Sequence, residues 1–487
     1  MSAIIDSRAS DLVPARHEDL RLVTGQGKYT ADWNLNGQLH AFVVRSDRAH
    51  ARLVKVDTAG ASAAAGVVAV LTAWDVAEAG FHEIPSGPPL VGTDGKPQNK
   101  SPLPVLATDR VRFVGQPIAM VIADTALAAQ DAAELVEIDY EELPAVASLD
   151  AALAPGAPQL HDSHPGNVGL VFEAGNSAAV DAAFAKAART TTLRVHSQRL
   201  IGAPMEPRAC LAAYDTTREH FTLYTPTQGV LGMRSSLAAV TGFDASRIEV
   251  VAQDVGGSFG LRGGPYPEHI LVMLAARKLG RPVKWVGSRS EVFLSDWHGR
   301  ALTLEASVAL ADDNTILAFR FEDQADLGAY TVYFQSMIGT KNITVTMGGV
   351  YRVPAMYARS TLVFTNTVPV SAYRGAGRPD IAYVIERLMD QAAAEHGLDP
   401  VALRRRNFIP PSAFPYTTAN GTVYDCGEFA AVMDKALKQA DYAGFPARRA
   451  ASEARGRLRG IGFGCYLEAS GAGTAPKDMV SAQFHGD

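Results

Sequence analysis

The chain has 487 residues, of which 47% are hydrophobic and 20% are charged, a composition typical of a folded globular protein with several domains. Its formal net charge of -6 provides no general attraction to a phosphate backbone or to an anionic membrane surface, so nucleic acid is not an expected partner. The three cysteines, Cys210, Cys426 and Cys465, are too few and too widely spaced to assemble an iron–sulfur cluster or a structural zinc site.

The N-terminal residues, the hydropathy and the cysteines of the chain together indicate its cellular compartment. Charged residues throughout 1–20 leave no room for the apolar core of a signal peptide. No window approaches the ~18 consecutive apolar residues of a membrane span. A sparse, odd set of cysteines argues against a secreted disulfide scaffold. We therefore expect a cytoplasmic protein without a membrane span.

The first part of the chain alternates strand-like runs with one helix. Asp124 is placed to cap a helix that continues through Val136. The stretch at 149–167 is rich in Ala, Pro, His and Gly, as exposed linkers are. Runs rich in β-branched residues predict strands at 39–44, 67–71, 111–123 (broken at Gly115–Pro117) and 137–146. These features divide the chain into a first domain at 1–150, a linker at 151–170 and a second domain at 171–487.

The second part mixes strands and helices. Proline in the first turn and glycine after the last turn frame two helices, one from Pro267 to Gly280 and one from Pro379 to Gly397. The other elements predicted in this part are strands at 191–195, 221–225 and 248–255 and a helix at 228–240 that stops at Gly242.

The C-terminal part of the sequence contains strand-like runs for which it supplies no partner strand. Gly460–Glu468 (GIGFGCYLE) is an apolar, strand-like run, and Val480–His485 looks like the next strand. A domain that stops within a sheet leaves a strand edge unpaired. We therefore expect that the chain is truncated at its C-terminus or is completed by a separate chain.

A glycine-rich loop, Asp254–Glu268 (DVGGSFGLRGGPYPE), lies between a predicted strand and a predicted helix. The dinucleotide fingerprint and the phosphate-binding loop both require glycines where this loop has other residues. Gly256–Gly260 matches the G-x-S-x-G nucleophile elbow, which would make Ser258 a hydrolase nucleophile, with Asp296 and His298, or Asp390 and His396, as candidate partners. An elbow needs a helix directly after the serine, whereas here the loop continues. Two further interpretations are a tight connection that binds nothing and a backbone cradle for an oxygen-rich cofactor.

The motifs GQGKY at 25–29, FVGQPIAMVI at 113–122, TPTQ at 225–228, DVGGSFG at 254–260 and AYRGAGRP at 372–379 follow one another along the chain. In this order they resemble the large subunits of molybdenum hydroxylases, the xanthine dehydrogenase/aldehyde oxidase family, in its carbon monoxide dehydrogenase-like branch. This resemblance implies an α+β fold, with an N-terminal α/β hammerhead domain followed by the first part of a molybdenum-cofactor-binding domain. The stretches similar to the hammerhead domain are Gly25–Tyr29 (GQGKY), His50–Val56, Phe113–Ile122 (FVGQPIAMVI) and Ala132–Val146. Those similar to the molybdenum-binding domain are Met205–Asp215 (MEPRACLAAYD), Thr225–Gln228 (TPTQ), Asp254–Gly260 (DVGGSFG) and Ala372–Pro379 (AYRGAGRP).

The resemblance implies roles for individual residues. Gln228 matches a glutamine that approaches an oxo ligand of molybdenum, and Arg374 matches an arginine beside the metal. No side chain is expected to ligate molybdenum directly, because the pterin holds it. Backbone N–H donors and an always-charged guanidinium suit such a polar centre. The loop whose backbone contacts the pterin dithiolene region and the oxo group is matched by Gly256, Gly257, Ser258, Phe259 and Gly260.

Departures from the family's patterns bear on the substrate. Carbon monoxide dehydrogenases resemble A-Y-R-C-S-F-R in the active loop, where the cysteine holds copper, but this chain has Gly375 in place of the thiolate. Purine-oxidising relatives carry a glutamate and a phenylalanine where this chain has Gly263 and Ala376. We therefore expect a roomier substrate pocket at Tyr373, Gly375, Ala376 and Gly263, suited to an N-heteroaromatic ring or an aldehyde.

The resemblance also implies a reaction and partners. The reaction is oxidative hydroxylation of an electron-poor carbon with water, at molybdenum bound as molybdopterin cytosine dinucleotide. An iron–sulfur small subunit and an FAD-binding medium subunit are expected to accept the electrons, since the chain has neither cluster-forming cysteines nor a flavin fingerprint. The family's catalytic base is a glutamate in a segment beyond Asp487, so no base is assigned here. The alternatives are a catalytically silent fragment or half-subunit that needs a second chain, and a serine hydrolase using Ser258.

Overall fold

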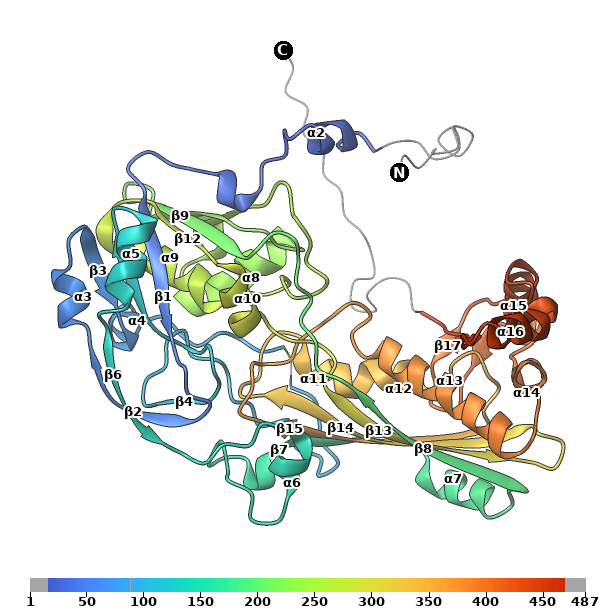
Figure 1. Ribbon diagram of the computed structural model, residues 1–487. Helices are drawn as coiled ribbons and strands as arrows, with labels where there is room; N and C mark the ends of the chain where they lie inside the picture. Colours follow the sequence, from blue (N-terminus) through green and yellow to red (C-terminus); the bar gives the residue numbers. More distant parts are fainter. Residues whose placement is uncertain (1–15, 88, 469–487) are drawn as a thin grey trace.

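The computed structural model describes residues 16–87 and 89–468. A seven-stranded mixed sheet, with the strand order β11-β10-β9-β12-β1-β5-β3, lies in the half of the molecule on the left of Figure 1. Its strands are β1 (Leu39–Arg45), β3 (Val67–Leu71), β5 (Pro117–Ala123), β9 (Ala209–Asp215), β10 (His220–Tyr224), β11 (Ile248–Val251) and β12 (Val283–Val286). The parallel pairing of β1 with β12, in which Leu39 lies opposite Val283, joins the first and second parts of the chain in one sheet.

Helices cover this sheet, and one of them is buried almost along its whole length. Pro267 stands in the first turn of α9 (Pro267–Leu279), and Gly280 ends the helix in the left-handed conformation at φ +63°. All residues of α9 from Pro267 to Ala276 are buried, because this helix packs against β9 and β12 and touches α8. The other helices here are α3 (Ala59–Ala63), α4 (Ala73–Glu78), α5 (Ala126–Ala133), α8 (Val230–Thr241) and α10 (Arg289–Ser295).

A second, five-stranded sheet with the order β7-β15-β14-β13-β8 extends to the right of Figure 1. The long helix α13 (Arg378–Glu395) covers one face and α7 (Ser177–Phe184) lies on the other. On β14, Phe319 and Phe321 enter the core cluster that includes α13, whereas Ala318 packs on the α7 side, as the two-residue period of a strand requires. The strands are β7 (Val168–Gly175), β8 (Arg189–Ser197), β13 (Leu302–Leu310), β14 (Ile316–Gly328) and β15 (Ala355–Phe364).

Smaller elements complete the described chain. A three-stranded sheet with the order β4-β2-β6 is formed by β2 (Ala51–Asp57), β4 (Arg110–Val111) and β6 (Glu137–Glu142). A π-helix, η4 (Ile338–Asn342), lies between the short helices α11 (Gln335–Met337) and α12 (Ile343–Val345). The remaining helices and strands are α2 (Asp19–Val23), α6 (Leu149–Leu153), α14 (Pro400–Asn407), β16 (Tyr416–Thr417), β17 (Val423–Tyr424), α15 (Phe429–Gln439) and α16 (Phe445–Glu453).

Most predicted elements are present, with corrections at their ends. The cap of α5 is Thr125 and not Asp124, because the Thr125 side chain accepts a hydrogen bond from the N–H of Ala128, and the helix ends at Ala133. The predicted strand at 248–255 is wrong beyond Val251, where the glycine-rich loop begins. The predicted strand at 137–146 ends at Glu142, and the helix expected from Gln228 begins at Val230. The segment 149–167, expected to be a linker, contains α6 and the 3-10 turn Pro165–Asn167.

The strand expected at Gly460–Glu468 is wrong. No described strand pairs with this segment. Within the segment Tyr466 is 73% exposed, whereas Cys465 and Leu467 are partly buried against the core. An apolar run forms a strand only where a neighbouring strand accepts its backbone hydrogen bonds, and the described residues supply none. The strand expected at Val480–His485 lies outside the described residues.

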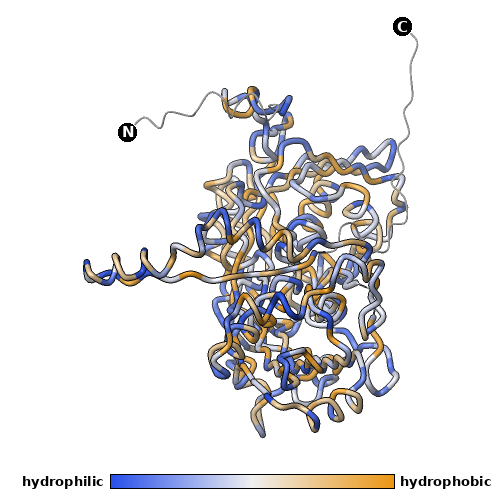
Figure 2. The backbone as a smooth tube through the Cα atoms, turned by 90° about the vertical axis from the view of Figure 1, so that its right-hand side faces the viewer, coloured by the Kyte–Doolittle hydropathy of each residue, from blue (hydrophilic) through white to orange (hydrophobic). Residues whose placement is uncertain are grey.

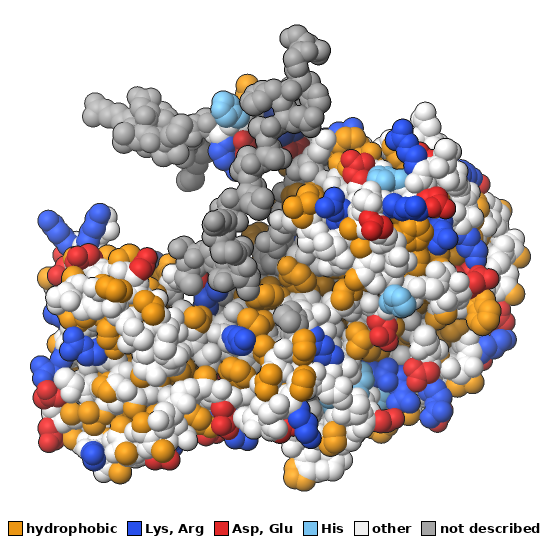
Figure 3. Space-filling model, turned by 180° about the vertical axis from the view of Figure 1, so that it is seen from behind, with side chains coloured by type: hydrophobic (Ala, Val, Ile, Leu, Met, Phe, Trp, Pro, Cys, Tyr) orange, Lys and Arg blue, Asp and Glu red, His pale blue; other side chains and the backbone are white. Residues whose placement is uncertain are grey.

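The surface and the hydropathy pattern agree with the composition. Hydrophilic and hydrophobic stretches alternate along the chain (Figure 2), and among the described residues no helix is long and apolar enough to cross a membrane. On the face shown in Figure 3, acidic and basic side chains are interspersed, without an extended surface of one sign.

Candidate functional site

The glycine-rich loop is anchored at both ends by a buried ion pair. The N–H of Gly256 donates to Oε2 of Glu206 at 2.8 Å, and Nη1 of Arg262 donates to the same oxygen at 3.0 Å. Both charged side chains are almost fully buried. A β-carbon at Gly256 would overlap Glu206, so glycine is required for this close approach. The loop therefore has one fixed path between β11 and α9.

The backbone of the loop turns through left-handed conformations. Gly257 and Gly260 have φ values of +107° and +104°, and Phe259, which is not a glycine, has φ +56°. Within the described chain, the N–H groups of Gly257, Ser258, Phe259 and Gly260 donate to no other group. Successive amides with alternating conformations form a concave donor surface that suits an anionic or oxygen-rich group.

Gln228 and Ser258 lie together beside this donor surface. The Ser258 hydroxyl donates to Oε1 of Gln228 at 2.8 Å and accepts the N–H of Arg262 at 3.2 Å. The backbone N–H of Gln228 donates to the carbonyl oxygen of Arg262 at 3.2 Å. The Nε2 group of Gln228 donates to nothing in the part of the chain that the structure describes, so it remains available to a ligand.

The serine hydrolase interpretation is wrong. Among the described residues no histidine forms a hydrogen bond with Ser258: His298 pairs with Arg199, and His396 pairs with Thr191. Asp296 is bound to buried Arg208. In addition, α9 begins at Pro267, after a further stretch of loop, whereas a nucleophile elbow places the helix directly after the serine.

The active loop meets the glycine-rich loop directly. The N–H of Arg374 donates to the carbonyl oxygen of Phe259 at 2.8 Å. The next three residues, Gly375, Ala376 and Gly377, have φ values of +90°, +47° and +92°. The π-helix supports this turn, because Nδ2 of Asn342 donates to the Ala376 carbonyl oxygen at 2.8 Å. The structure therefore brings together the sequence-predicted Gln228, the 256–260 loop and Arg374.

Arg300 and Asp380 position the active loop, and sequence analysis missed both. Nη2 of Arg300 donates to the carbonyl oxygen of Arg374 at 2.8 Å, and Nη1 approaches that of Tyr373 at 3.4 Å. Asp380 accepts from the same guanidinium at 3.2 Å and from the Ser197 hydroxyl. Burial raises the pKa of Asp380, and the charge of Arg300 opposes that rise. Asp380 directly follows the motif AYRGAGRP, and this position could have identified it as a residue of the site. Arg300 is 80 residues away from Asp380 and lies in no recognisable motif, so the sequence contains no indication of its role.

A cavity of about 580 Å³ opens at the active loop. Of the residues expected to form the substrate pocket, its wall includes Tyr373 but not Gly375, Ala376 or Gly263, and it also includes Arg374. Arg374 is exposed and forms no ion pair within the described residues, so its charge is available to a ligand. The other residues of the wall are Arg300, Arg378, Pro379, Ala382, Tyr383, Glu386, Arg387, Phe463, Gly464, Tyr466, Leu467 and Glu468.

The space expected at Gly263 is filled by another side chain. A β-carbon at Gly263 would lie 2.6 Å from Cε1 of Tyr333, and one at Gly264 would lie 3.0 Å from Cδ2 of the same ring. Tyr333 has a strained φ of +26° and stacks near Trp297 with ring centroids 6.4 Å apart. The two glycines make room for this tyrosine and do not widen a pocket.

The fold places a row of backbone N–H donors, 257–260, between two loops, an arrangement that suits an oxygen-rich group. The model of the aldehyde oxidase and xanthine dehydrogenase a/b hammerhead domain matches residues 24–144, and that of the molybdopterin cofactor-binding domain matches residues 160–408. The chain therefore belongs to the aldehyde oxidase and xanthine dehydrogenase family, which confirms the expected α+β fold.

Several relatives share most of this chain. It is 36% identical to the nicotine 6-hydroxylase large subunit of Paenarthrobacter nicotinovorans, over 94% of this chain and 55% of the relative. It is 33% identical to the carbon monoxide dehydrogenase large chain of Hydrogenophaga pseudoflava, over 94% of this chain and 58% of the relative. The crystal structure of quinoline 2-oxidoreductase from Pseudomonas putida 86 is similar with a TM-score of 0.85 and 35% identity, covering 91% of this chain and 56% of that one.

The chain spans little more than half the length of these relatives. This chain covers a larger share of the nicotinate dehydrogenase large molybdopterin subunit of Eubacterium barkeri. The two are 30% identical over 80% of this chain and 87% of the relative.

Proposed function

We propose that this chain contributes the metal cradle of a molybdenum hydroxylase large subunit. The observation that carries the proposal is a row of four backbone N–H groups, at 257–260, that donate no hydrogen bond within the described chain. This row lies between the Gln228 amide and the loop of Arg374. These residues are partly exposed, so their N–H groups are accessible to a ligand, and such a row suits the oxo and dithiolene groups of a molybdenum cofactor. The residues present therefore fit the group that the family's name implies.

When bound, the molybdenum cofactor supplies a centre that transfers oxygen derived from water and accepts two electrons. The chain's own residues bind and orient it: the 257–260 amides and Nε2 of Gln228 donate hydrogen bonds, and the Arg374 guanidinium supplies a permanent positive charge. Arg300 holds the Arg374 backbone through its carbonyl oxygen. The reaction also needs a base that accepts the proton of the attacking water, and no described residue is assigned that role.

The substrate we propose is an N-heteroaromatic ring or an aldehyde. Two relatives whose names contain nicotine and quinoline support the heteroaromatic class. Carbon monoxide is disfavoured, because a copper-binding thiolate at position 375 would need a β-carbon that overlaps the Pro379 ring. Tyr373 lines the cavity at the active loop, where it is placed to contact a planar substrate.

The proposal extends to cofactor form and partners. We propose molybdopterin cytosine dinucleotide, an iron–sulfur subunit and an FAD-binding subunit, because all three cysteines are free and, among the described residues, form no group that could hold a metal cluster. We also propose that a second chain supplies the rest of the large subunit, a division supported by the comparable extent of the Eubacterium barkeri relative. A reducing, cytoplasmic compartment is consistent with free Cys210, Cys426 and Cys465.

The test is to co-express the chain with a chain that supplies the second half of the large subunit and to measure bound molybdenum and the cytidine nucleotide released by acid. Ser258→Pro removes one N–H donor from the cradle, whereas the matched Ser258→Ala keeps it. We expect Ser258→Ala to retain molybdenum and Ser258→Pro to lose at least nine-tenths of it, roughly the loss expected for a strong donor. Thermal denaturation of both variants shows whether Ser258→Pro is still folded.

The second candidate is a catalytically silent fragment or half-subunit. The observation that favours it is the partial match to two relatives, of which this chain spans 55% and 58%. A reconstituted complex that contains no molybdenum, although both chains are folded and associated, would support this candidate and reject the enzyme proposal.

A further inference from the structure

A second cavity, of about 400 Å³, lies in the hammerhead part of the molecule. It shares no residue with the cavity at the active loop or with the glycine-rich loop. Its volume is within the range of small-molecule sites. Its lining residues come from α4 and the loop after it, from 100–112, from His161 in the segment predicted as a linker, and from Tyr330, which follows β14.

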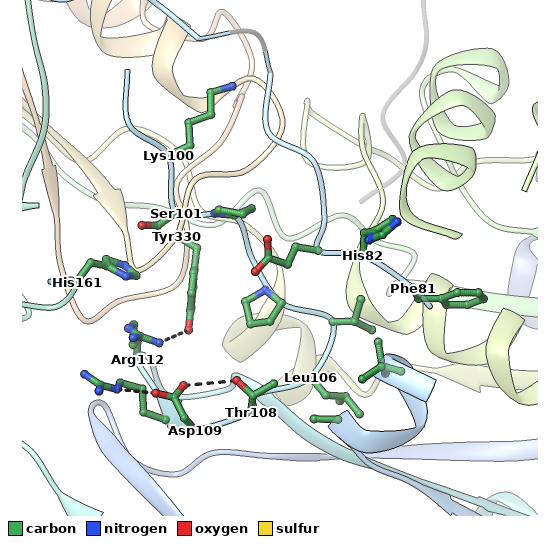
Figure 4. Close-up of a pocket in the computed structure, with 18 residues that line it drawn as sticks. Phe81, His82, Lys100, Ser101, Leu106, Thr108, Asp109, Arg112, His161 and Tyr330 are labelled. Carbon is green, nitrogen blue, oxygen red and sulfur yellow. Dashed lines mark hydrogen bonds and ion pairs between the residues drawn. The ribbon is translucent and has the colours of Figure 1, made fainter. Parts of the chain in front are cut away.

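The two sides of this cavity differ in chemistry. Figure 4 shows Arg112, Tyr330 and His161 on one side, and Phe81 and Leu106 on the other. The apolar side is extended by residues of α4, among them Val76 and Ala77. An apolar wall opposite a polar one favours a ligand with an apolar body and a single polar end.

Arg112 provides the charge on the polar side. Its Nε donates to the Leu160 carbonyl oxygen at 3.1 Å, and its Nη1 donates to the Tyr330 hydroxyl at 3.1 Å. Among the residues that the structure describes, no carboxylate pairs with Arg112 and no acceptor meets its Nη2. A half-buried guanidinium without a carboxylate is uncommon, because desolvation of a charge is costly unless it is paired.

None of the neighbouring polar groups that the structure describes forms an ion pair with Arg112. Asp109 pairs with Arg110 at 3.1 Å, and the Lys100 ammonium donates to the Gly87 carbonyl oxygen. His161 binds the Ala329 carbonyl oxygen at 2.7 Å, and burial lowers the pKa of this histidine to about 4, so it is neutral near pH 7. Glu83 also lines the cavity; it is exposed and forms no ion pair with the described residues.

We propose that this cavity binds a small organic carboxylate, with its apolar body against Phe81, Leu106 and α4 and its carboxylate on Arg112. A guanidinium recognises a carboxylate through two parallel N–H donors, and Nη2 together with the second N–H of Nη1 is free to supply them. The Tyr330 hydroxyl, which also accepts from Nε2 of Gln116 at 3.0 Å, holds the guanidinium in place.

The experiment titrates the full chain with benzoate by calorimetry, and with benzamide as the neutral analogue of the same shape. Benzoate should bind saturably, and benzamide at least about tenfold more weakly, as expected when a charge-assisted pair is lost. Inorganic phosphate should also bind more weakly, because it has no apolar body. Absence of saturable benzoate binding, or equal affinity for benzamide or phosphate, overturns the proposal.

Two substitutions locate the site. Arg112→Gln should weaken benzoate binding at least about tenfold, and Ala77→Trp, at an exposed position on α4, should block the cavity without removing a core residue. Ala63→Trp is the matched control, because Ala63 is an exposed alanine on α3 that does not line the cavity. If Arg112→Gln unfolds the chain, Ala77→Trp still decides: unchanged benzoate affinity in that variant overturns the proposal.

Discussion

The residues that follow Arg374 are determined by backbone geometry more than by side-chain chemistry. Gly375 has φ +90°, and a β-carbon there would overlap the ring of Pro379, which opens α13. The backbone conformation at position 375 and the nearby Pro379 ring therefore both require glycine, where carbon monoxide dehydrogenases have a copper-binding cysteine. A thiolate cannot be restored at this position without moving the helix start.

The first prediction concerns Gly375→Cys. The substitution should bind no Cu(I) and should lower the free energy of unfolding by more than the ~1–3 kcal/mol of left-handed strain alone, because overlap with Pro379 adds to that strain. Gly37→Cys is the control for strain without overlap, since Gly37 has φ +69° and open space around it. Urea denaturation and copper titration measure the two effects. Stoichiometric copper in Gly375→Cys, with unchanged stability, would contradict the prediction.

The second prediction concerns the pair of Arg300 and Asp380. Their side chains are 14% and 1% exposed, so removal of Arg300 leaves a buried carboxyl group without its cation. Arg300→Met should lower the free energy of unfolding by about 3–5 kcal/mol. Adding Asp380→Leu should recover part of this loss but not all, because the bond from Arg300 to the Arg374 carbonyl oxygen stays broken. A double mutant no more stable than Arg300→Met would show that the ion pair is not the cause.

The sequence identified the residues that line the site but not the residues that position its loops through hydrogen bonds and packing. Gln228, the 256–260 loop and Arg374 carry recognisable motifs, and the structure brings them together. Arg300 and Tyr333 carry none. Their effect depends on contacts with residues far away in the chain, and a local pattern holds no information about such contacts.

At the scale of elements, helix ends were the most predictable features. Proline in the first turn and glycine after the last turn act through local geometry, and both bound α9 as expected. The cap of α5 was misplaced by one residue, because Asp124 and Thr125 are both good capping residues and only the hydrogen bond to Ala128 decides between them. The strand at 460–468 failed because strands depend on partners that the sequence does not specify.

A buried acid beneath the π-helix gives the third prediction. Asp323 on β14 accepts from the Ser360 hydroxyl at 2.5 Å, its other oxygen has no partner, and burial raises its pKa to about 8. The unfolded chain releases this proton near pH 4, whereas the folded chain keeps it up to about pH 8. This group should therefore make the free energy of unfolding fall as pH rises from 4 to 8, by up to about 1.4 kcal/mol per pH unit.

The substitution Asp323→Asn tests whether this group makes the free energy of unfolding fall as pH rises. The amide cannot ionise and still accepts from Ser360, so the variant should gain stability over the unsubstituted chain as pH rises through this window. Urea denaturation at several pH values measures the difference. Asp312→Asn, at an exposed position, makes the same change of charge and should leave the slope unchanged. A parallel pH dependence of Asp323→Asn and the unsubstituted chain would reject an uncharged Asp323.

At the scale of the whole molecule, one sheet crosses the boundary between the two predicted domains. β1, β3 and β5 belong to the segment 1–150, and the other four strands belong to 171–487. Buried Arg45 reinforces the junction, with ion pairs to Glu268 at 2.5 Å and to Glu291 at 2.7 Å. The family models divide the chain in the same region, between 144 and 160, yet the hydrogen bonds of the sheet continue across the division.

The fourth prediction follows from this shared sheet. A protease site inserted at the exposed residues 154–156 would cut the chain between the two predicted domains. The fragments should still elute together in size-exclusion chromatography and should separate only in denaturant, because β1 remains paired with β12 and Arg45 remains buried among carboxylates. Arg45→Met should promote separation after cleavage, since it leaves Glu291 without this cation. Separate elution of the native fragments would mean that the two parts fold as independent domains and that the β1–β12 pairing contributes little to holding them together.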